Sequence, residues 1–279
     1  MPVKINANGT NETSSLLRLS QTEGQTSKSL KSIASGSRIN GAADDAAGLT
    51  ISTNLRSLIK GLETASRNSQ DAISLTQIAD GGLDQTATAL QRVRELTVQA
   101  SNGTLDQSAR NAIGAEVSQA LTEIDRVAHS TTFGSQKLLD GSVTGGFNFN
   151  VGSSGDPSNS VNITIANSSS TGLGIAGTPG TIASGGDLSS VLSSIDNAIT
   201  SIANTRTELG SHQNRLETTL SNTSNSIVNL ASSFSRISDT DSASAISEFS
   251  AGQIQNQFAL ALQAQANSLN RSSISNLLR

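Results

Sequence analysis

The longest regular pattern of apolar residues lies between residues 188 and 237. Apolar side chains recur there at alternating steps of four and three residues, and of fifteen such positions only Arg206, Gln213 and Thr223 are not apolar. A 3.5-residue repeat held over this length is typical of one long helix that carries a coiled-coil seam. At 1.5 Å per residue the helix would be about 75 Å long.

A second seam with the same spacing runs from Leu55 to Thr97, and each of its positions is apolar or small. Small seam residues let helices approach closely, so we expect this segment to pair with the first. After the break SNGTLD, a third apolar face runs from Ile113 to Val127 and predicts a third helix. Thr104 with Gln107 reads as a capping box at its start.

The middle of the chain, from about residue 130 to 187, is rich in Gly, Ser, Thr and Asn. FNFNVG (147–152) and VNITIA (161–166) alternate around turn residues and predict two strands of a hairpin. GLGIAG (172–177) matches the GxGxxG pattern of dinucleotide-binding loops. TPG follows it directly and no βαβ unit surrounds it, so we predict a loop that does not lead into a helix.

Both ends of the chain are amphipathic and only thinly apolar. An isolated helix with so little to bury is marginal in water, so we expect the ends to become ordered by docking on each other and on neighbouring molecules. The apolar residues of these assembly helices include Leu16, Leu30, Ile33, Ile254, Phe258, Leu262, Leu269 and Leu277.

Composition narrows the class of protein. Apolar residues make up 34% of the chain and aromatic residues 2%, which suits thin helical bundles better than a thick core. A net charge of −4 without a basic stripe argues against nucleic-acid binding. The absence of cysteine excludes thiolate chemistry, and no apolar run is long enough for membrane insertion.

No catalytic or metal-binding motif is found. His129 and His212 lie in unrelated contexts and are interpreted as polar helix positions. Asp44 and Asp45 are adjacent, so on a helix they diverge by about 100° and cannot act as an acid–base pair. We interpret them as carboxylates at a helix start. The chain is therefore not expected to be an enzyme or to bind a cofactor or metal.

The charged stretch LQRVRELTVQ (90–99) is unusual in this chain. On a helix, Leu90, Val93 and Leu96 face the seam, whereas Arg92 and Glu95 lie on the solvent-exposed face. The pattern predicts a solvated or binding surface and not a catalytic cluster.

Several stretches resemble bacterial flagellin, the subunit of the flagellar filament. SGSRINGAADDAAGLTIS (35–52) is similar to the SSGLRINSAKDDAAG-type signature of that family, and SRISDTDSASAISEFSAGQI (235–254) resembles its SRIEDSDYA-type hinge. The resemblance covers about residues 1–140 and 188–279. The middle, which varies in the family, is short here.

The resemblance implies a mainly α protein with long helices in coiled-coil bundles and a small β-hairpin region. Residues 1–42 with 243–279 would form an inner-tube coiled coil. Residues 43–242 would form an outer-tube helical bundle that contains a short variable β/loop region at 142–187. Such subunits self-assemble into the filament used for motility.

The resemblance also implies partners. They are further copies of the chain, hook-junction and cap proteins, a flagellar export chaperone that masks the C-terminal helix, and a Toll-like innate immune receptor. The N-terminus lacks the apolar core of a signal peptide, which fits export through the flagellar type III apparatus to the extracellular flagellum.

Residues 90–99 are similar to the flagellin motif that the Toll-like receptor reads. The residues implied at this receptor-contact and assembly surface are Gln91, Arg92, Glu95, Leu96, Gln99 and Glu116. Receptor-active flagellins carry an arginine where this chain has Ala120, which lowers the receptor affinity that we expect. Two alternatives share the helical plan: a hook–filament junction protein, and a surface adhesin of flagellin type.

Overall fold

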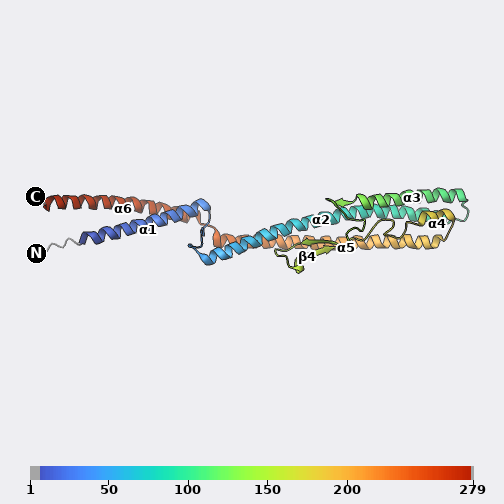
Figure 1. The fold of residues 1–279 in the computed structure, drawn as a ribbon, viewed down its shortest axis with the longest axis horizontal. Coiled ribbons are helices and arrows are strands. Elements are labelled where there is room, and N and C mark those ends of the chain that lie inside the picture. Colours follow the sequence, from blue (N-terminus) through green and yellow to red (C-terminus); the bar gives the residue numbers. More distant parts are fainter. Residues whose placement is uncertain (1–6, 278–279) are drawn as a thin grey trace. The chain divides into compact units, whose positions relative to one another are not determined.

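The computed structural model describes the backbone of residues 7–277 and the side chains of residues 13–269, 271 and 272. Long helices dominate this range (Figure 1), which confirms the prediction of a mainly α protein. The five long helices of the described residues are α1 (Ala7–Ser35), α2 (Ala46–Ala100), α3 (Gln107–Ser130), α5 (Leu188–Ser238) and α6 (Ser242–Leu277).

The chain divides into two compact units, and the boundaries fall inside α2 and α5. Unit 1 holds the residues up to Ser57 together with those from Asn229 onward. Unit 2 holds Leu58–Val228. Unit 1 therefore joins two segments that are distant in the sequence.

The core of unit 2 follows the predicted seams of α2 and α5. Ten successive seam positions of α2 are at most 1% exposed: Ala65, Ser69, Ala72, Thr76, Ala79, Leu83, Thr86, Leu90, Val93 and Thr97. The hydroxyl groups among them donate to carbonyls of the same helix, for example Ser69 Oγ to Ala65 O at 2.8 Å. Because these buried hydroxyls are paired, they do not carry the cost of unsatisfied polar groups. Every predicted seam position of α5 is buried or half-buried.

The start of α3 differs from the prediction. Asp106 is the N-cap, and its carboxylate accepts a hydrogen bond from the Ala109 amide at 2.7 Å. The predicted capping box of Thr104 and Gln107 is therefore wrong. Aspartate is a strong N-cap and lies next to the first helical residue, and Thr104 instead donates to the Asn102 side chain.

The predicted hairpin is present, with slightly shorter strands. β3 (Phe147–Asn150) pairs antiparallel with β4 (Ser160–Ile163), and the 3-10 turn η1 (Pro157–Asn159) precedes β4. The amide of Asn68 on α2 donates to the Asn150 carbonyl at 2.8 Å and ties the hairpin to that helix. A second, two-residue pairing joins β1 (Thr132–Phe133) to β2 (Gln136–Lys137).

The segment after GLGIAG corrects a prediction. A short helix, α4 (Thr178–Ser184), begins directly after Gly177 and has Pro179 in its first turn. Pro179 does not prevent the helix, because the first turn needs no amide donor from it. Residues 164–177 contain no strand, so the segment still lacks the strand that a dinucleotide-binding loop requires.

In unit 1, α1 and α6 pack side by side, with small residues at the contact. Ser29 and Ala245 are buried there, and Gly252 lies directly against Thr26. Short antiparallel links join the breaks after α1 and before α6. The Arg38 amide donates to Ser238 O at 2.7 Å, and a second bond at 3.1 Å runs from the Thr240 amide to Gly36 O.

Candidate functional site

Arg92 on α2 is the centre of an exposed ion-pair cluster on unit 2. Its Nη2 lies 2.6 Å from Glu116 Oε1 on α3, and its Nη1 lies 3.3 Å from Glu95 Oε2. The hydrogen bond to Glu116, followed by the attraction of that carboxylate, raises the pKa of Arg92 above its ordinary value. Exposed pairs of this kind add little stability. They hold the guanidinium in one orientation on the surface.

The other predicted residues of this surface fall into two groups. Gln91 and Gln99 are exposed on α2. Leu96 is only 1% exposed and packs in the core, so its side chain does not contribute to the exposed surface of the subunit. The reason is the helical period, which turns position 96 toward the side of Val93. Ala120 is half-buried on α3.

A groove of about 380 Å³ lies beside Arg92 between α2 and α3. Its floor includes the buried side chains of Ile124 and Val127. Its rim carries Glu123, which accepts a hydrogen bond from Arg126 Nε at 2.7 Å. That bond lowers the pKa of Glu123. The groove thus offers an apolar floor with charged groups on both sides.

Three ion pairs between α2 and α5 were missed by the sequence analysis. Arg206, at a seam position, places its Nε 2.7 Å from Asp80 and its Nη1 2.8 Å from Asp84. Arg94 Nε lies 2.7 Å from Asp196. The sequence did contain a signal for the Arg206 pairs. A charged residue at a seam position needs an oppositely charged partner, and Asp80 and Asp84, four residues apart, lie on one face of α2.

The helix α6 carries apolar side chains on two faces. Ala245 and Gly252 are buried on one side. At about 100° per residue, four exposed side chains lie within about 80° of arc, centred about 130° away from the buried side: Ile254, Phe258, Leu262 and Leu269. Two further exposed apolar side chains of α6, Ile246 and Leu260, lie between this face and the buried side.

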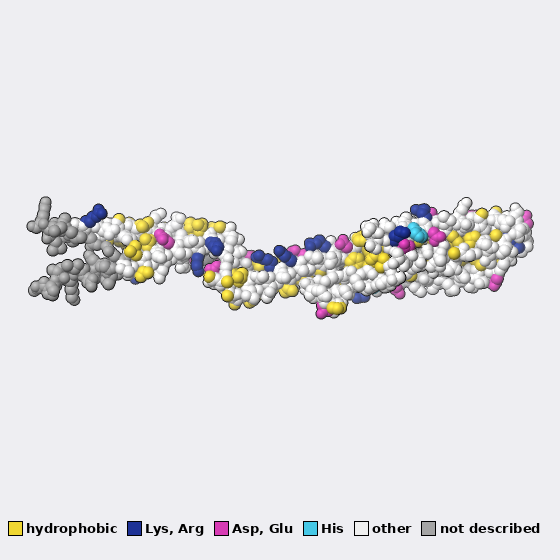
Figure 2. Space-filling model, in the orientation of Figure 1, with side chains coloured by type: hydrophobic (Ala, Val, Ile, Leu, Met, Phe, Trp, Pro, Cys, Tyr) yellow, Lys and Arg dark blue, Asp and Glu magenta, His cyan; other side chains and the backbone are white. Residues whose placement is uncertain are grey.

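Phe258 is 69% exposed, although a phenyl ring gains from burial. On α1, Leu16 and Leu30 are also exposed and Ile33 is half-buried. Leu277 lies outside the residues whose side chains are described. Figure 2 shows hydrophobic side chains on the surface of the α1–α6 pair amid mostly uncharged polar atoms. Among the described residues, unit 1 therefore presents an apolar surface that is exposed to solvent.

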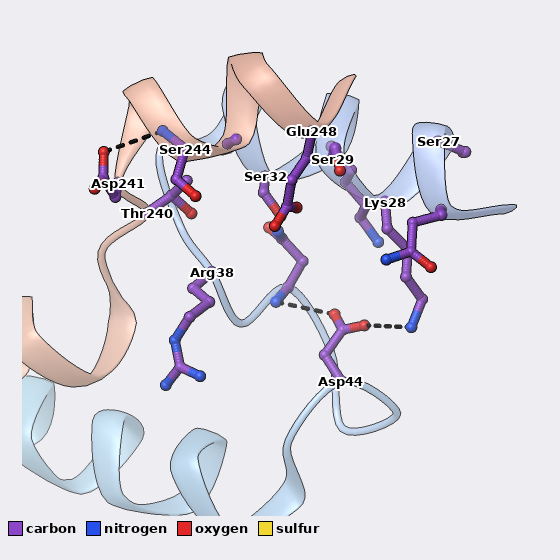
Figure 3. A pocket seen from close by; sticks show the side chains of 14 residues that line it. Ser27, Lys28, Ser29, Ser32, Arg38, Asp44, Thr240, Asp241, Ser244 and Glu248 are labelled. Atoms are coloured by element: carbon purple, nitrogen blue, oxygen red, sulfur yellow. Dashed lines mark hydrogen bonds and ion pairs between the residues drawn. The ribbon is translucent and has the colours of Figure 1, made fainter. Parts of the chain in front are cut away.

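A polar groove of about 660 Å³ lies in unit 1 between α1, the segment before α2 and the start of α6 (Figure 3). Lys28 Nζ lies 3.5 Å from Asp44, which also accepts the Asn40 amide at 3.2 Å. The hydrogen bond from Asn40 is the main cause that lowers the pKa of Asp44, and Lys28 adds to it. The helix-start prediction holds for Asp45, whose carboxylate accepts the Gly48 amide at 2.8 Å.

Neither histidine lines the two grooves. His129 places Nδ1 2.7 Å from Asp125 O on its own helix, and His212 is half-buried on α5. Among the described residues no cluster of three or more His, Cys, Asp or Glu is arranged to hold a metal ion. No helix in the described range is long and apolar enough to cross a membrane.

Long paired helices with an exposed apolar surface are typical of a structural protein that packs against its neighbours through helix faces. Two family models match the chain: the bacterial flagellin N-terminal helical region over residues 5–144 and the bacterial flagellin C-terminal helical region over residues 192–278. The chain belongs to the flagellin family.

Curated relatives agree. A flagellin of Halalkalibacterium halodurans is 40% identical over 243 residues, which cover 87% of this chain and 88% of the relative. A flagellin of Bacillus subtilis is 40% identical over 283 residues, with 90% and 92% covered. The chain is thus a structural component of the flagellar filament, which serves motility, and not an enzyme.

A solved structure of a putative flagellar hook-associated protein from Vibrio parahaemolyticus matches 70% of this chain and 100% of its own length. Its TM-score is 0.59 and its sequence identity is 13%. This likeness shows the long-helix fold alone, because identity at that level carries no function.

Proposed function

We propose that this chain polymerises with copies of itself into the flagellar filament, and that the exposed apolar residues of α1 and α6 form the contact between copies. In this arrangement residues 1–42 with 243–279 are the inner-tube coiled coil. Residues 43–242 are the outer-tube bundle, with 142–187 as its short variable region. The proposal places the assembled protein in the extracellular flagellum.

The outer face of α6 is the observation that carries this proposal. A helix with apolar residues on opposite sides needs two partners, and α1 supplies only one. A second copy of the chain carries an identical apolar surface at the same position on its own α6. A contact of this kind that does not close into a ring generates a helical filament.

The test replaces Phe258 by serine and compares it with Gln253→Ser as a matched control. Gln253 is exposed on the same helix, about 140° from Phe258. Burial of one phenylalanine is worth about 1.5–3 kcal/mol, so the critical concentration for polymerisation should rise roughly ten- to hundredfold in Phe258→Ser. It should change little in Gln253→Ser. Filament mass after salting-out with sulfate is measured by sedimentation and electron microscopy.

Equal critical concentrations for Phe258→Ser and the wild type would refute the role of this face. Circular dichroism of both monomers supplies the folding control, since each variant must keep the wild-type helical signal. If both serine variants polymerise poorly, helix propensity and not the apolar face sets assembly.

The surface around Arg92 is proposed as the site read by a Toll-like innate immune receptor, and as an assembly contact within the filament. Its exposed members are Gln91, Arg92, Glu95, Gln99 and Glu116. Support comes from the fixed guanidinium and from the groove beside it, since arginine next to an apolar pocket is a frequent centre of binding energy.

The test of this surface compares Arg92→Ala with Arg126→Ala. Both arginines are exposed and both pair with a glutamate three residues away. Loss of a central arginine typically costs more than about 1 kcal/mol, so Arg92→Ala should weaken receptor binding more than fivefold. Arg126→Ala should not. Similar loss in both variants would mean that overall charge, and not this site, governs binding.

We propose that the same apolar face also binds a chaperone during export. Before assembly, a flagellar export chaperone covers the outer side of α6, and the chain passes through the type III apparatus. Cap and hook-junction proteins then guide its addition. Phe258→Ser should weaken chaperone binding in parallel with polymerisation, and retention of full chaperone affinity would separate the two roles.

A further inference from the structure

The turn between α2 and α3 contains an Asn-Gly pair in an unusual setting. The chain has three such pairs, Asn8–Gly9, Asn40–Gly41 and Asn102–Gly103. Asn102 and Gly103 are both exposed, and they lie outside the helices. The side chain of Asn8 lies outside the described residues.

Thr104 holds the carboxamide oxygen of Asn102 through two donors. The Thr104 amide lies 3.2 Å from Asn102 Oδ1, and the Thr104 hydroxyl donates to the same oxygen at 3.0 Å. Two donors on one carbonyl oxygen polarise the carbon–oxygen bond and stabilise negative charge that develops on that oxygen. The Cγ atom of Asn102 is therefore an activated electrophile.

The nucleophile and the leaving group at this site are both free. The Gly103 amide makes no backbone hydrogen bond, and a Cβ added at Gly103 would meet no atom within 4 Å. This nitrogen is thus not held by a backbone acceptor, and the backbone at Gly103 has open space beside it. The Nδ2 group of Asn102 has no partner in the described structure, so it can take a proton from water and depart.

Asn40 has the same dipeptide but the opposite setting. Its Nδ2 donates to the Ser37 carbonyl at 2.8 Å, and its backbone amide is bound to Asp44 at 3.2 Å. The residue is half-buried. The leaving group and the backbone that must rotate are both held, and its Oδ1 accepts no hydrogen bond in the described structure.

We propose that Asn102 is a site of self-catalysed deamidation, activated by Thr104. The Gly103 nitrogen loses its proton to water and bonds to Asn102 Cγ. The bond from Cγ to Nδ2 breaks, ammonia leaves, and a cyclic succinimide remains. Water then opens either carbonyl to give aspartate or isoaspartate. The net reaction consumes one water and releases one ammonia, with no change of oxidation state.

The product alters this turn in two ways. A new carboxylate appears just after the C-terminal end of α2, where the helix dipole disfavours negative charge. The isoaspartate form also adds a backbone carbon and breaks the turn that Asn102 makes with Thr104. Because the amide is not restored, the modified fraction increases with the age of the subunit.

The experiment incubates purified protein near pH 8 and follows both sites by mass spectrometry of tryptic peptides. Trypsin releases residues 95–110, in which Asn102 is the sole asparagine, and residues 39–56, which contain Asn40. An isoaspartyl methyltransferase assay identifies the rearranged product. In the folded protein Asn102 should deamidate faster than Asn40, whereas in guanidinium the two rates should converge.

The variant Thr104→Val tests the activation itself. It removes one donor and keeps the shape and the backbone amide, so deamidation at Asn102 should slow roughly two- to tenfold, the worth of one hydrogen bond. Thr122→Val, at an exposed position on α3, is the matched control and should leave the rate unchanged. Equal rates at Asn102 and Asn40 in the folded protein would overturn the proposal. So would an unchanged rate in Thr104→Val.

Discussion

Two adjacent glycines inside α2 should respond differently to the same change, Gly→Ala. Gly81 is exposed, and a Cβ built there meets no atom within 4 Å. Gly82 is buried, and its Cβ would lie 2.7 Å from Leu139 Cδ1 and 2.7 Å from Thr131 Oγ1. Both variants gain the same helix propensity, about 1 kcal/mol.

The steric cost separates the two variants. Gly81→Ala should raise the free energy of unfolding by about 1 kcal/mol, because nothing opposes the propensity gain. At Gly82 the added methyl presses on Leu139, which is fully buried and has no space to move into. Overpacking of this kind costs about 1–3 kcal/mol. The propensity term cancels between the variants, so Gly82→Ala should be less stable than Gly81→Ala by about the same 1–3 kcal/mol.

Urea unfolding followed by circular dichroism measures this difference, with equal slopes in all three proteins as the condition for comparing midpoints. Equal stabilisation in both variants would refute the packing argument, since it would mean that the segment from Thr131 to Leu139 yields without cost.

Three further effects follow from single contacts. Asp45→Ala removes the side-chain cap of α2 and should lower the free energy of unfolding by about 1 kcal/mol in the same urea assay; no change would show that water replaces the cap. Ile124→Ala empties a fully buried position and should cost about 2–5 kcal/mol, checked by calorimetry. The pKa of Asp44 lies below its ordinary value. Its contacts therefore stabilise the folded state at pH values above the ordinary pKa, and this stabilisation is lost as the pH falls through the folded-state pKa. An NMR titration should show this pKa move up in Lys28→Ala without reaching the ordinary value, because the Asn40 hydrogen bond remains.

The sequence predicted the elements in which one local rule is repeated many times. The seam of α5 could be found because twelve of its fifteen positions are apolar, so a few exceptions did not hide the period. The hairpin was visible because alternation and turn residues agreed. At α4 a single proline is a weak signal against a helix, because its effect depends on its position in the helix.

The contacts between segments distant in the sequence were harder to predict from the sequence alone. Arg206 looked like a defect in the seam, and only the fold brings Asp80 and Asp84 within reach of it. Leu96 shows the converse problem. Sequence similarity to a motif identifies the equivalent position, but it does not show whether that side chain is exposed in the folded subunit.

The thin core and the proposed polymer have one physical origin. With 34% apolar residues, the chain fills narrow seams in unit 2 and has too few large side chains to enclose both faces of α6. An apolar face that none of the described residues covers gains stability from contact with another molecule. In the proposed filament each added copy covers that face on the previous one and exposes its own, so growth continues at one end. Replacing the outer face of α6 with polar residues should therefore abolish growth while leaving unit 2 folded, because the core of unit 2 contains none of these side chains.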